Sequence, residues 1–96
     1  MGFKIVFTKP AIADLEGLFP FIAQDNPSAA EKFGYAIADK TGRLISFPLI
    51  GRVVPEFNVP NIREIIHRVY RIVYRVREEP SVGVILRLWH AARGIP

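Results

Sequence analysis

The sequence of 96 residues contains no cysteine, which excludes a disulfide framework, a thiolate metal site and a cysteine nucleophile. Histidine is scarce. His67 and His90 are too few for a metal site unless carboxylates assist, and no carboxylate stands at a matching spacing. A Walker loop, a dinucleotide fingerprint and a nucleophile elbow are also missing. We therefore expect no metal and no cofactor.

Long apolar runs are missing too. A helix needs about 20 apolar residues to cross a bilayer, and no stretch approaches that length. The apolar part of the N-terminus is too short for a signal peptide. Nothing argues for export, so we expect a cytoplasmic protein with no membrane partner. A chain of this length has room for one core, and residues 1–96 are predicted to form a single domain.

Lysine is absent after Lys40. Residues 1–50 carry five basic and five acidic side chains, whereas residues 51–96 carry eight arginines and four glutamates. The planar guanidinium fork suits carboxylate and phosphate groups, so this half of the chain indicates an anionic partner, either nucleic acid or an acidic protein segment. The alternative is a solvated sheet face that only keeps the protein in solution.

What is present is a pair of alternating runs in the second half of the chain. In Val69–Arg77 the apolar face consists of Tyr70, Ile72, Tyr74 and Val76. After a break at Glu78–Ser81 the alternation resumes, with Val82, Val84, Leu86 and Leu88 on the apolar face and Ile85, Arg87 and Trp89 on the other. Period-two alternation is typical of half-buried strands, so the two runs predict a hairpin whose apolar face needs a cover.

The first half of the chain is predicted to supply that cover. Phe3–Thr8 indicates a strand, and Thr8 can cap a helix whose core stripe is Ile12, Leu15, Phe19 and Ile22. Pro20 should kink this helix or split it into two pieces. Asn26 caps a second helix with the stripe Ala30, Phe33, Ile37, Thr41 and Leu44, and Leu49–Pro60 is predicted to be a loop or an irregular edge segment.

The predicted order is β-α-α-(loop)-β-β-β. Because helices and strands are segregated, the fold class is α+β, with an N-terminal strand and an αα-hairpin packed on one face of a small, mainly antiparallel sheet. The other face can stay open to solvent, and we expect the arginines there. Glu64 is predicted to point inward, where it needs a partner.

The candidate binding residues follow from strand parity. Arg71, Arg75 and Arg77 share one face, and Arg87 shares its face with Trp89. Arginines beside an exposed aromatic ring can bind phosphate and stack a base, or they can clamp an acidic peptide, unless Trp89 is plain core. His90 could act as a general acid or base in RNA cleavage, but its parity with Leu88 favours a structural role.

Several short motifs occur in a characteristic order. They are Ala13-Asp14-Leu15, Asn26-Pro27 with Ala29-Ala30, the run Phe47–Arg52, Ile62-Arg63-Glu64, the run Tyr70–Arg75, and Ile85–His90 followed by Arg93. In this arrangement nearly the whole chain resembles the RelE/ParE superfamily of bacterial toxins from type II toxin–antitoxin modules. The Tyr70–Arg75 run and the Trp89–Arg93 ending look closer to the ParE-like branch.

The resemblance implies a growth-inhibiting cytoplasmic toxin that a cognate antitoxin protein neutralises. ParE-like members are associated with poisoning DNA gyrase, whereas RelE-like members are endoribonucleases that cut mRNA on the ribosome. A non-toxic partner-binding domain of the same fold is a third possibility. The candidate residues for target and antitoxin binding are Arg63, Arg71, Arg75, Arg77, Arg87, Trp89 and Arg93, and His90 is catalytic only in a nuclease. The missing lysines weaken the nuclease interpretation.

Overall fold

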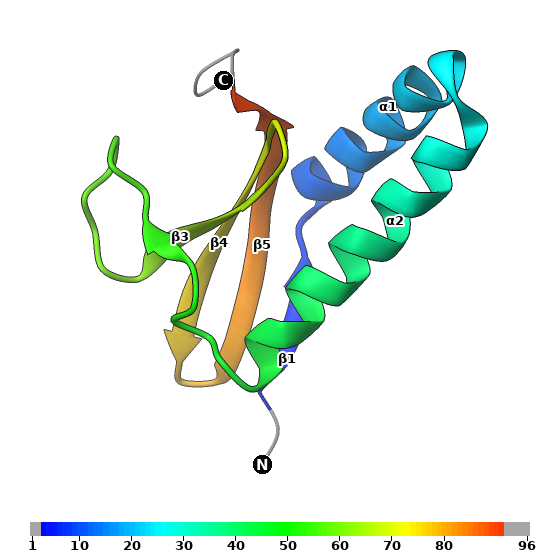
Figure 1. Cartoon of the computed structure of the whole chain (residues 1–96). Helices are drawn as coiled ribbons and strands as arrows, with labels where there is room; N and C mark the ends of the chain where they lie inside the picture. The colour runs from blue at the N-terminus through cyan, green and yellow to red at the C-terminus, as the bar shows by residue number, and fades with distance from the viewer. Residues whose placement is uncertain (1–2, 92–96) are drawn as a thin grey trace.

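The computed structural model describes residues 3–91. Its elements are β1 (Lys4–Phe7), α1 (Lys9–Asp25), α2 (Pro27–Gly42), a 3-10 turn η1 (Arg43–Ile45), β2 (Arg52–Val53), β3 (Ile62–His67), β4 (Tyr70–Glu78) and β5 (Ser81–His90). The two helices lie against one face of the sheet, as Figure 1 shows. This arrangement confirms the predicted α+β fold, with the short strand β2 added inside the 49–60 segment. Neither helix within the described part of the chain is long and apolar enough to cross a membrane.

The sheet has the strand order β1-β5-β4-β3-β2, so β4 is its central strand, as the alternation predicted. β3 and β5 flank β4 in antiparallel register, and the N-terminal strand β1 runs parallel to β5. After β1 the chain forms both helices before it enters the other strands of the sheet. α1 contacts β5 and α2 contacts β3, so the αα-hairpin lies over the middle of the sheet (Figure 1).

Both helices begin at the predicted caps. The Thr8 hydroxyl accepts a hydrogen bond from the Ala11 amide and donates one to the Leu86 carbonyl, which fastens the start of α1 to β5. The Asn26 side chain accepts from the first amides of α2. The alternative that Pro20 splits the first helix into two pieces is wrong, because α1 is a single helix. Pro20 and Glu16 are both exposed, so water can satisfy the Glu16 carbonyl that Pro20 leaves without its helical donor.

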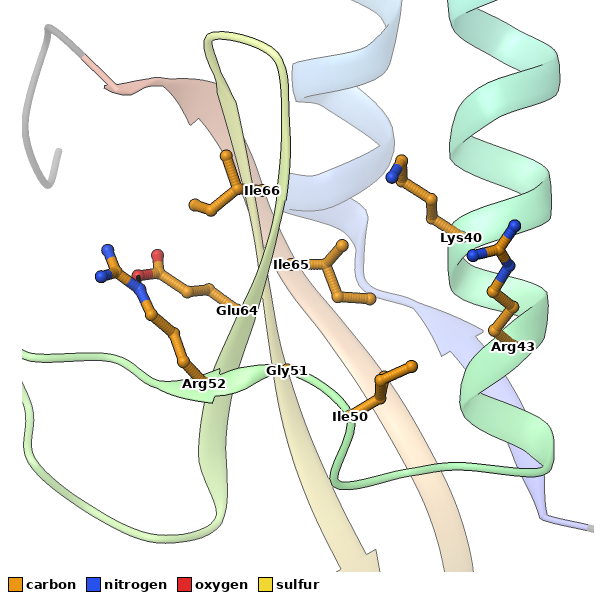
Figure 2. A pocket seen from close by; sticks show the side chains of 8 residues that line it. All are labelled: Lys40, Arg43, Ile50, Gly51, Arg52, Glu64, Ile65 and Ile66. Atoms are coloured by element: carbon orange, nitrogen blue, oxygen red, sulfur yellow. Dashed lines mark hydrogen bonds and ion pairs between the residues drawn. The ribbon is translucent and has the colours of Figure 1, made fainter.

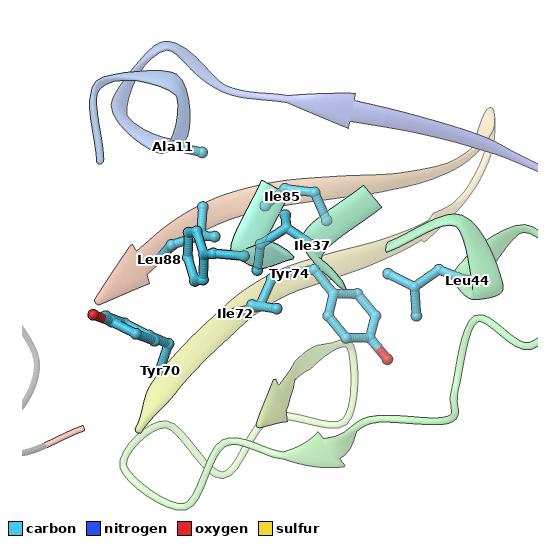
Figure 3. Packing of buried hydrophobic residues seen from close by; sticks show 9 residues of the cluster. Ala11, Ile37, Leu44, Tyr70, Ile72, Tyr74, Ile85 and Leu88 are labelled. Carbon is cyan, nitrogen blue, oxygen red and sulfur yellow. The ribbon is translucent and has the colours of Figure 1, made fainter. Parts of the chain in front are cut away.

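The main core lies between the helices and the sheet (Figure 3). The predicted stripe of the second helix is buried as expected, and Ile37 and Leu44 pack with Ile72 and Tyr74 of the central strand. The core prediction for Ile12 is wrong, because this side chain is 45% exposed. The hydrogen bonds that tie Thr8 and Asp14 to β5 turn the first turn of α1 so that Ala11 faces the sheet instead.

A β-bulge changes the predicted parity of β5. Val73 pairs with Arg87, whereas the next residue of β4, Tyr74, pairs with Ile85, so Leu86 is an extra residue in the ladder. Ile85 therefore enters the helix-facing core, and Leu86 packs on the opposite face with the second apolar cluster. The prediction that Val82, Val84 and Leu86 share a face with Leu88 is wrong for this reason, because a bulge reverses the side-chain alternation on one side of it. Val82 and Val84 pair with Arg77 and Arg75 and lie on the arginine face.

Gly51 is the glycine that this packing requires. Its amide donates to the Tyr74 hydroxyl at 3.0 Å, and that hydroxyl donates to the Pro48 carbonyl at 2.8 Å. A Cβ atom on Gly51 would lie 2.5 Å from the Glu64 carbonyl oxygen and 2.7 Å from the Tyr74 hydroxyl. By contrast, a Cβ on Gly17 of α1 would meet nothing within 4 Å.

The same substitution should therefore have opposite effects at these two glycines. Gly51→Ala forces the new Cβ atom against the Glu64 carbonyl and the Tyr74 hydroxyl, so it should lower the free energy of unfolding by about 1–3 kcal/mol. Gly17→Ala removes backbone freedom from an open helix position and should raise it by about 0.5–1 kcal/mol. Urea denaturation of the two variants measures both changes. A shift of the two midpoints in the same direction would contradict this view of the packing.

Candidate functional site

The sheet face opposite the helices is only partly open. The segment of residues 54–60, here called the 54–60 loop, lies on this side of the sheet (Figure 1). Val54 packs there with Val73 and Trp89 in a second apolar cluster, and Ile62 and Leu86 join it. Arg71 and Trp89 are each only 6% exposed. The prediction that Arg71 lies on an open face is therefore wrong, and of the two interpretations of Trp89 the structure supports plain core, since a segment without any periodic pattern covers both residues.

Glu64 is the centre of an ionic network under this loop. Its carboxylate is buried, as predicted, and accepts from Arg52 Nε at 2.7 Å and from Arg71 Nε at 2.6 Å. The two terminal nitrogens of Arg71 donate to the two carboxylate oxygens of Glu56 at 2.8 and 2.7 Å. The Arg71 guanidinium also lies 5.5 Å from the centroid of the Trp89 ring. The guanidinium of Arg71 therefore binds carboxylates within the protein through all three of its nitrogens.

The network keeps Glu56 and Arg71 charged. Hydrogen bonds from Arg71 and from its own backbone amide lower the pKa of Glu56 to about 2. The bonds to Glu56 and then to Glu64 raise the pKa of Arg71, although burial opposes the increase. Charge-assisted, bidentate bonds of this kind are the stronger class of hydrogen bond.

Arg87 is also paired within the protein. Its guanidinium donates to both Asp14 oxygens at 2.8 and 3.0 Å, and the Leu88 amide donates to the same carboxylate. The bonds to Asp14 raise the pKa of Arg87. The pairing of Asp14 with Arg87 was not predicted, because the two residues are 73 positions apart in the sequence. Asp14 therefore connects α1 to β5 and removes Arg87 from the set of unpaired cations.

Three predicted cations remain together at an open surface. Arg63, Arg75 and Arg77 line a groove of about 580 Å³, here called the arginine groove, which Leu49, Pro60, Asn61, Val76, Glu78 and Glu79 complete. Arg63 donates to the carbonyls of Pro60, Leu49 and Gly51, which hold its guanidinium in place. Arg75 and Arg77 are exposed, and neither forms an ion pair within residues 3–91.

His90 lies on the opposite face of the sheet from Arg75 and Arg77. It pairs with Tyr70, and the two rings meet edge to face with centroids 5.6 Å apart. Tyr70 belongs to the helix-facing core. The structure thus separates His90 from the arginine groove. Arg93, the last of the predicted binding residues, lies outside the described residues.

A second groove, of about 290 Å³, begins at the end of α2 and continues around β3, with Arg52, Glu64 and Ile66 on the side away from α2; we call it the helix–sheet groove (Figure 2). Its cations are Lys40, Arg43 and Arg52, and its apolar side chains include Ile50 and Ile66, which are 57% and 43% exposed. Sequence analysis missed this groove. The available signal was the apolar run of residues 44–50, which follows a helix end carrying two cations. Within residues 3–91 no three metal-ligating side chains come together.

The Glu56–Arg71 pair predicts a pH dependence of stability. Folding lowers the pKa of Glu56 from its ordinary 4.5 to about 2, so the pair stabilises the folded state fully above pH 4.5. That stabilisation is lost as the pH falls from 4.5 to about 2. Glu56→Gln should remove this part of the pH dependence, whereas Glu31→Gln, at an exposed position on α2, should keep it. Urea midpoints measured across this pH range test the prediction, and parallel curves for the wild type and Glu56→Gln would contradict it.

Solved structures of toxin–antitoxin proteins share this architecture. A chain of the chromosomal ParDE system from P. aeruginosa matches with a TM-score of 0.70 at 23% identity, covering 91% of this chain and 94% of that one. The RelBE2 toxin–antitoxin complex of Mycobacterium tuberculosis contains a chain with a TM-score of 0.61 at 27% identity, covering 94% and 99%. A free mutant of the E. coli toxin RelE matches with a TM-score of 0.69 at 20% identity, covering 98% and 88%.

The sequence itself matches one family along almost its whole length. The profile described as the ParE toxin of the type II toxin–antitoxin system parDE matches residues 5–95. No curated relative matches the chain. The family match agrees with the β-α-α-β-β-β order and with the likeness to both ParDE and RelE structures. This chain therefore belongs to the ParE toxin family of type II toxin–antitoxin systems, within the RelE/ParE superfamily.

Proposed function

We propose that this protein inhibits growth in the cytoplasm by binding and poisoning DNA gyrase, and that a cognate antitoxin neutralises it. Family membership supports the toxin role. The observation that supports the gyrase target is that unpaired cations gather in an open groove while the histidine lies elsewhere. A protein that acts by binding its target needs no general acid or base of its own. RNA cleavage needs such a group within hydrogen-bond reach of the reacting atoms.

The arginine groove is the proposed contact with the target. Arg75 and Arg77 are two residues apart on β4, so both project from the same face of the sheet. Arg63 is held beside them by three backbone carbonyls. Exposed cations without internal carboxylate partners steer an anionic surface toward the groove and then contact it, so they contribute to both the rate and the strength of association.

A ribosome-dependent endoribonuclease is the alternative. It would place cations and a general acid or base around one phosphate. Here Arg71 is bound by Glu56 and Glu64, Arg87 is bound by Asp14, and His90 packs against Tyr70. These contacts keep His90 away from the cations of the arginine groove, and that arrangement favours the gyrase proposal.

We also propose that the antitoxin binds in the helix–sheet groove. The ParDE and RelBE2 relatives are toxin–antitoxin systems, which supports an antitoxin partner here. The groove combines exposed Ile50 and Ile66 with Lys40 and with Arg43, whose partner Asp39 is itself exposed. Phe47 and Leu49 are exposed close by in the chain. A segment with apolar and acidic residues fits this surface. A non-toxic partner-binding domain would use the same groove without inhibiting growth.

The two toxin mechanisms give different mutational results. Arg75→Ala combined with Arg77→Ala should abolish growth inhibition, because the groove loses its unpaired cations, whereas His90→Gln should remain toxic. The matched control is Lys32→Ala with Arg68→Ala, which removes two exposed cations far from the arginine groove and should also remain toxic. The measurement is growth after induction, together with the order in which DNA cleavage complexes accumulate and translation stops.

Cleavage complexes that accumulate before translation stops are the expected result. Purified protein that cuts ribosome-bound mRNA, with activity lost in His90→Gln, would instead establish the nuclease. A folded wild type that never inhibits growth would leave the non-toxic domain as the function. Full toxicity of the Arg75→Ala, Arg77→Ala double variant would contradict the role of the arginine groove.

A further inference from the structure

The 54–60 loop covers Arg71 and Trp89 and is attached to the sheet mainly near its ends. The Val54 amide donates to the Ile62 carbonyl, and the Ile62 amide donates to the Val59 carbonyl. Between these points the loop bonds to itself, through the amides of Phe57 and Asn58 to the Val54 carbonyl. Glu56 is the one side chain of the loop that binds the sheet through an ion pair within the described residues. Glu56 therefore acts as a latch on a loop that otherwise holds its own shape.

The charges under the loop need one further anion. Without Glu56 the cluster consists of Arg52, Arg71 and the buried Glu64, a net charge of +1. Glu56 brings this sum to zero. Its side chain is 42% exposed, whereas those of Arg71 and Glu64 are 8% and 0% exposed. Glu56 is thus the exposed partner, which another carboxylate can replace while Arg71 and Glu64 stay in place.

We propose that Arg71 and Trp89 form a concealed binding site for a carboxylate of a partner protein, and that Glu56 occupies this site as a built-in competitor. Each Glu56 oxygen meets one terminal nitrogen of Arg71, which is the bidentate geometry that a planar carboxylate provides. The guanidinium is held for this purpose, because Glu64 binds its Nε and the Trp89 ring lies beside it. An acidic segment of a partner can replace Glu56 atom for atom.

Trp89 offers such a ligand a further contact. Its indole N–H is buried and has no acceptor within residues 3–91. Because the Glu56 oxygens do not reach this N–H, a partner segment can supply the acceptor from a group next to its carboxylate, and its neighbouring residues can pack on the cluster of Val54, Val73 and Trp89. This site lies beyond the proposed function, since it requires neither gyrase nor the arginine groove, and its ligand is a carboxylate whatever the target of the toxin.

Glu56 lowers the apparent affinity of the site by keeping it occupied. A ligand that binds only the open form has its dissociation constant raised by the inverse of the open fraction. Minor conformations of proteins are typically populated at about 0.1–10%, so removing the latch should tighten binding by at least about tenfold.

Trp89 is the only tryptophan in the chain, so its fluorescence reports on this site without a label. The experiment titrates the purified full chain with hexaglutamate at physiological salt and compares the wild type, Glu56→Gln and Glu31→Gln. Both variants gain the same charge, but Glu31 is exposed on α2. Glu56→Gln should bind hexaglutamate at least about tenfold more tightly than the wild type, and Glu31→Gln should bind as the wild type does. Acrylamide quenching of Trp89 should increase in Glu56→Gln and decrease again when hexaglutamate is added.

Two further measurements test whether the site binds a carboxylate through the Arg71 guanidinium. Arg71→Lys in the Glu56→Gln background should abolish the gain in affinity for hexaglutamate, because lysine keeps the charge but lacks the planar guanidinium. Hexathymidylate replaces hexaglutamate in a parallel titration, and an equal or larger gain with it would overturn the assignment to a carboxylate. No gain in Glu56→Gln, or the same gain in Glu31→Gln, would overturn the concealed site. If circular dichroism finds Glu56→Gln unfolded, Glu56→Asp replaces it, since a shorter carboxylate weakens the latch and should also tighten binding.

Discussion

The buried carboxylate of Glu64 is the constraint on which the second face of the sheet depends. A charge removed from water costs several kcal/mol unless partners replace its hydration. Here Arg52 and Arg71 supply those partners from β2 and β4, on either side of β3. Arg71 then requires a second carboxylate, which fixes the position of Glu56 and of the loop that carries it. One buried charge thus determines the placement of an edge strand, a loop and two arginines.

This constraint sorts the arginines of the second half of the chain into two groups. Arg52, Arg71 and Arg87 bind internal carboxylates and hold elements together. Arg75 and Arg77 lie in the second half of β4, which the 54–60 loop does not cover. Neither forms an ion pair with a carboxylate within residues 3–91. An arginine-rich strand can therefore contain structural and binding residues side by side, and the local partner decides between the roles.

The sequence predicts the parts of the structure that arise from local patterns. The parity of β4, the core stripe of α2 and the caps Thr8 and Asn26 depend on neighbouring residues and were predicted correctly. The exposure of Arg75 and Arg77 followed from the same parity. The burial of Arg71 and the pairing of Arg87 could not be predicted, because their partners lie 15 and 73 residues away in segments whose position no periodic pattern indicates. The bulge at Leu86 likewise depends on the pairing with β4 and leaves no mark in the alternation.

The division of the arginines into structural and binding residues is tested most directly by comparing Arg71→Ala with Arg75→Ala in urea denaturation. Arg71→Ala should lower the free energy of unfolding by about 2–3 kcal/mol. The decrease is smaller than for a buried carboxylate that loses all its partners, because Arg52 still binds Glu64. Arg75→Ala should change it by no more than about 0.5 kcal/mol. An Arg71→Ala variant as stable as Arg75→Ala would contradict the account.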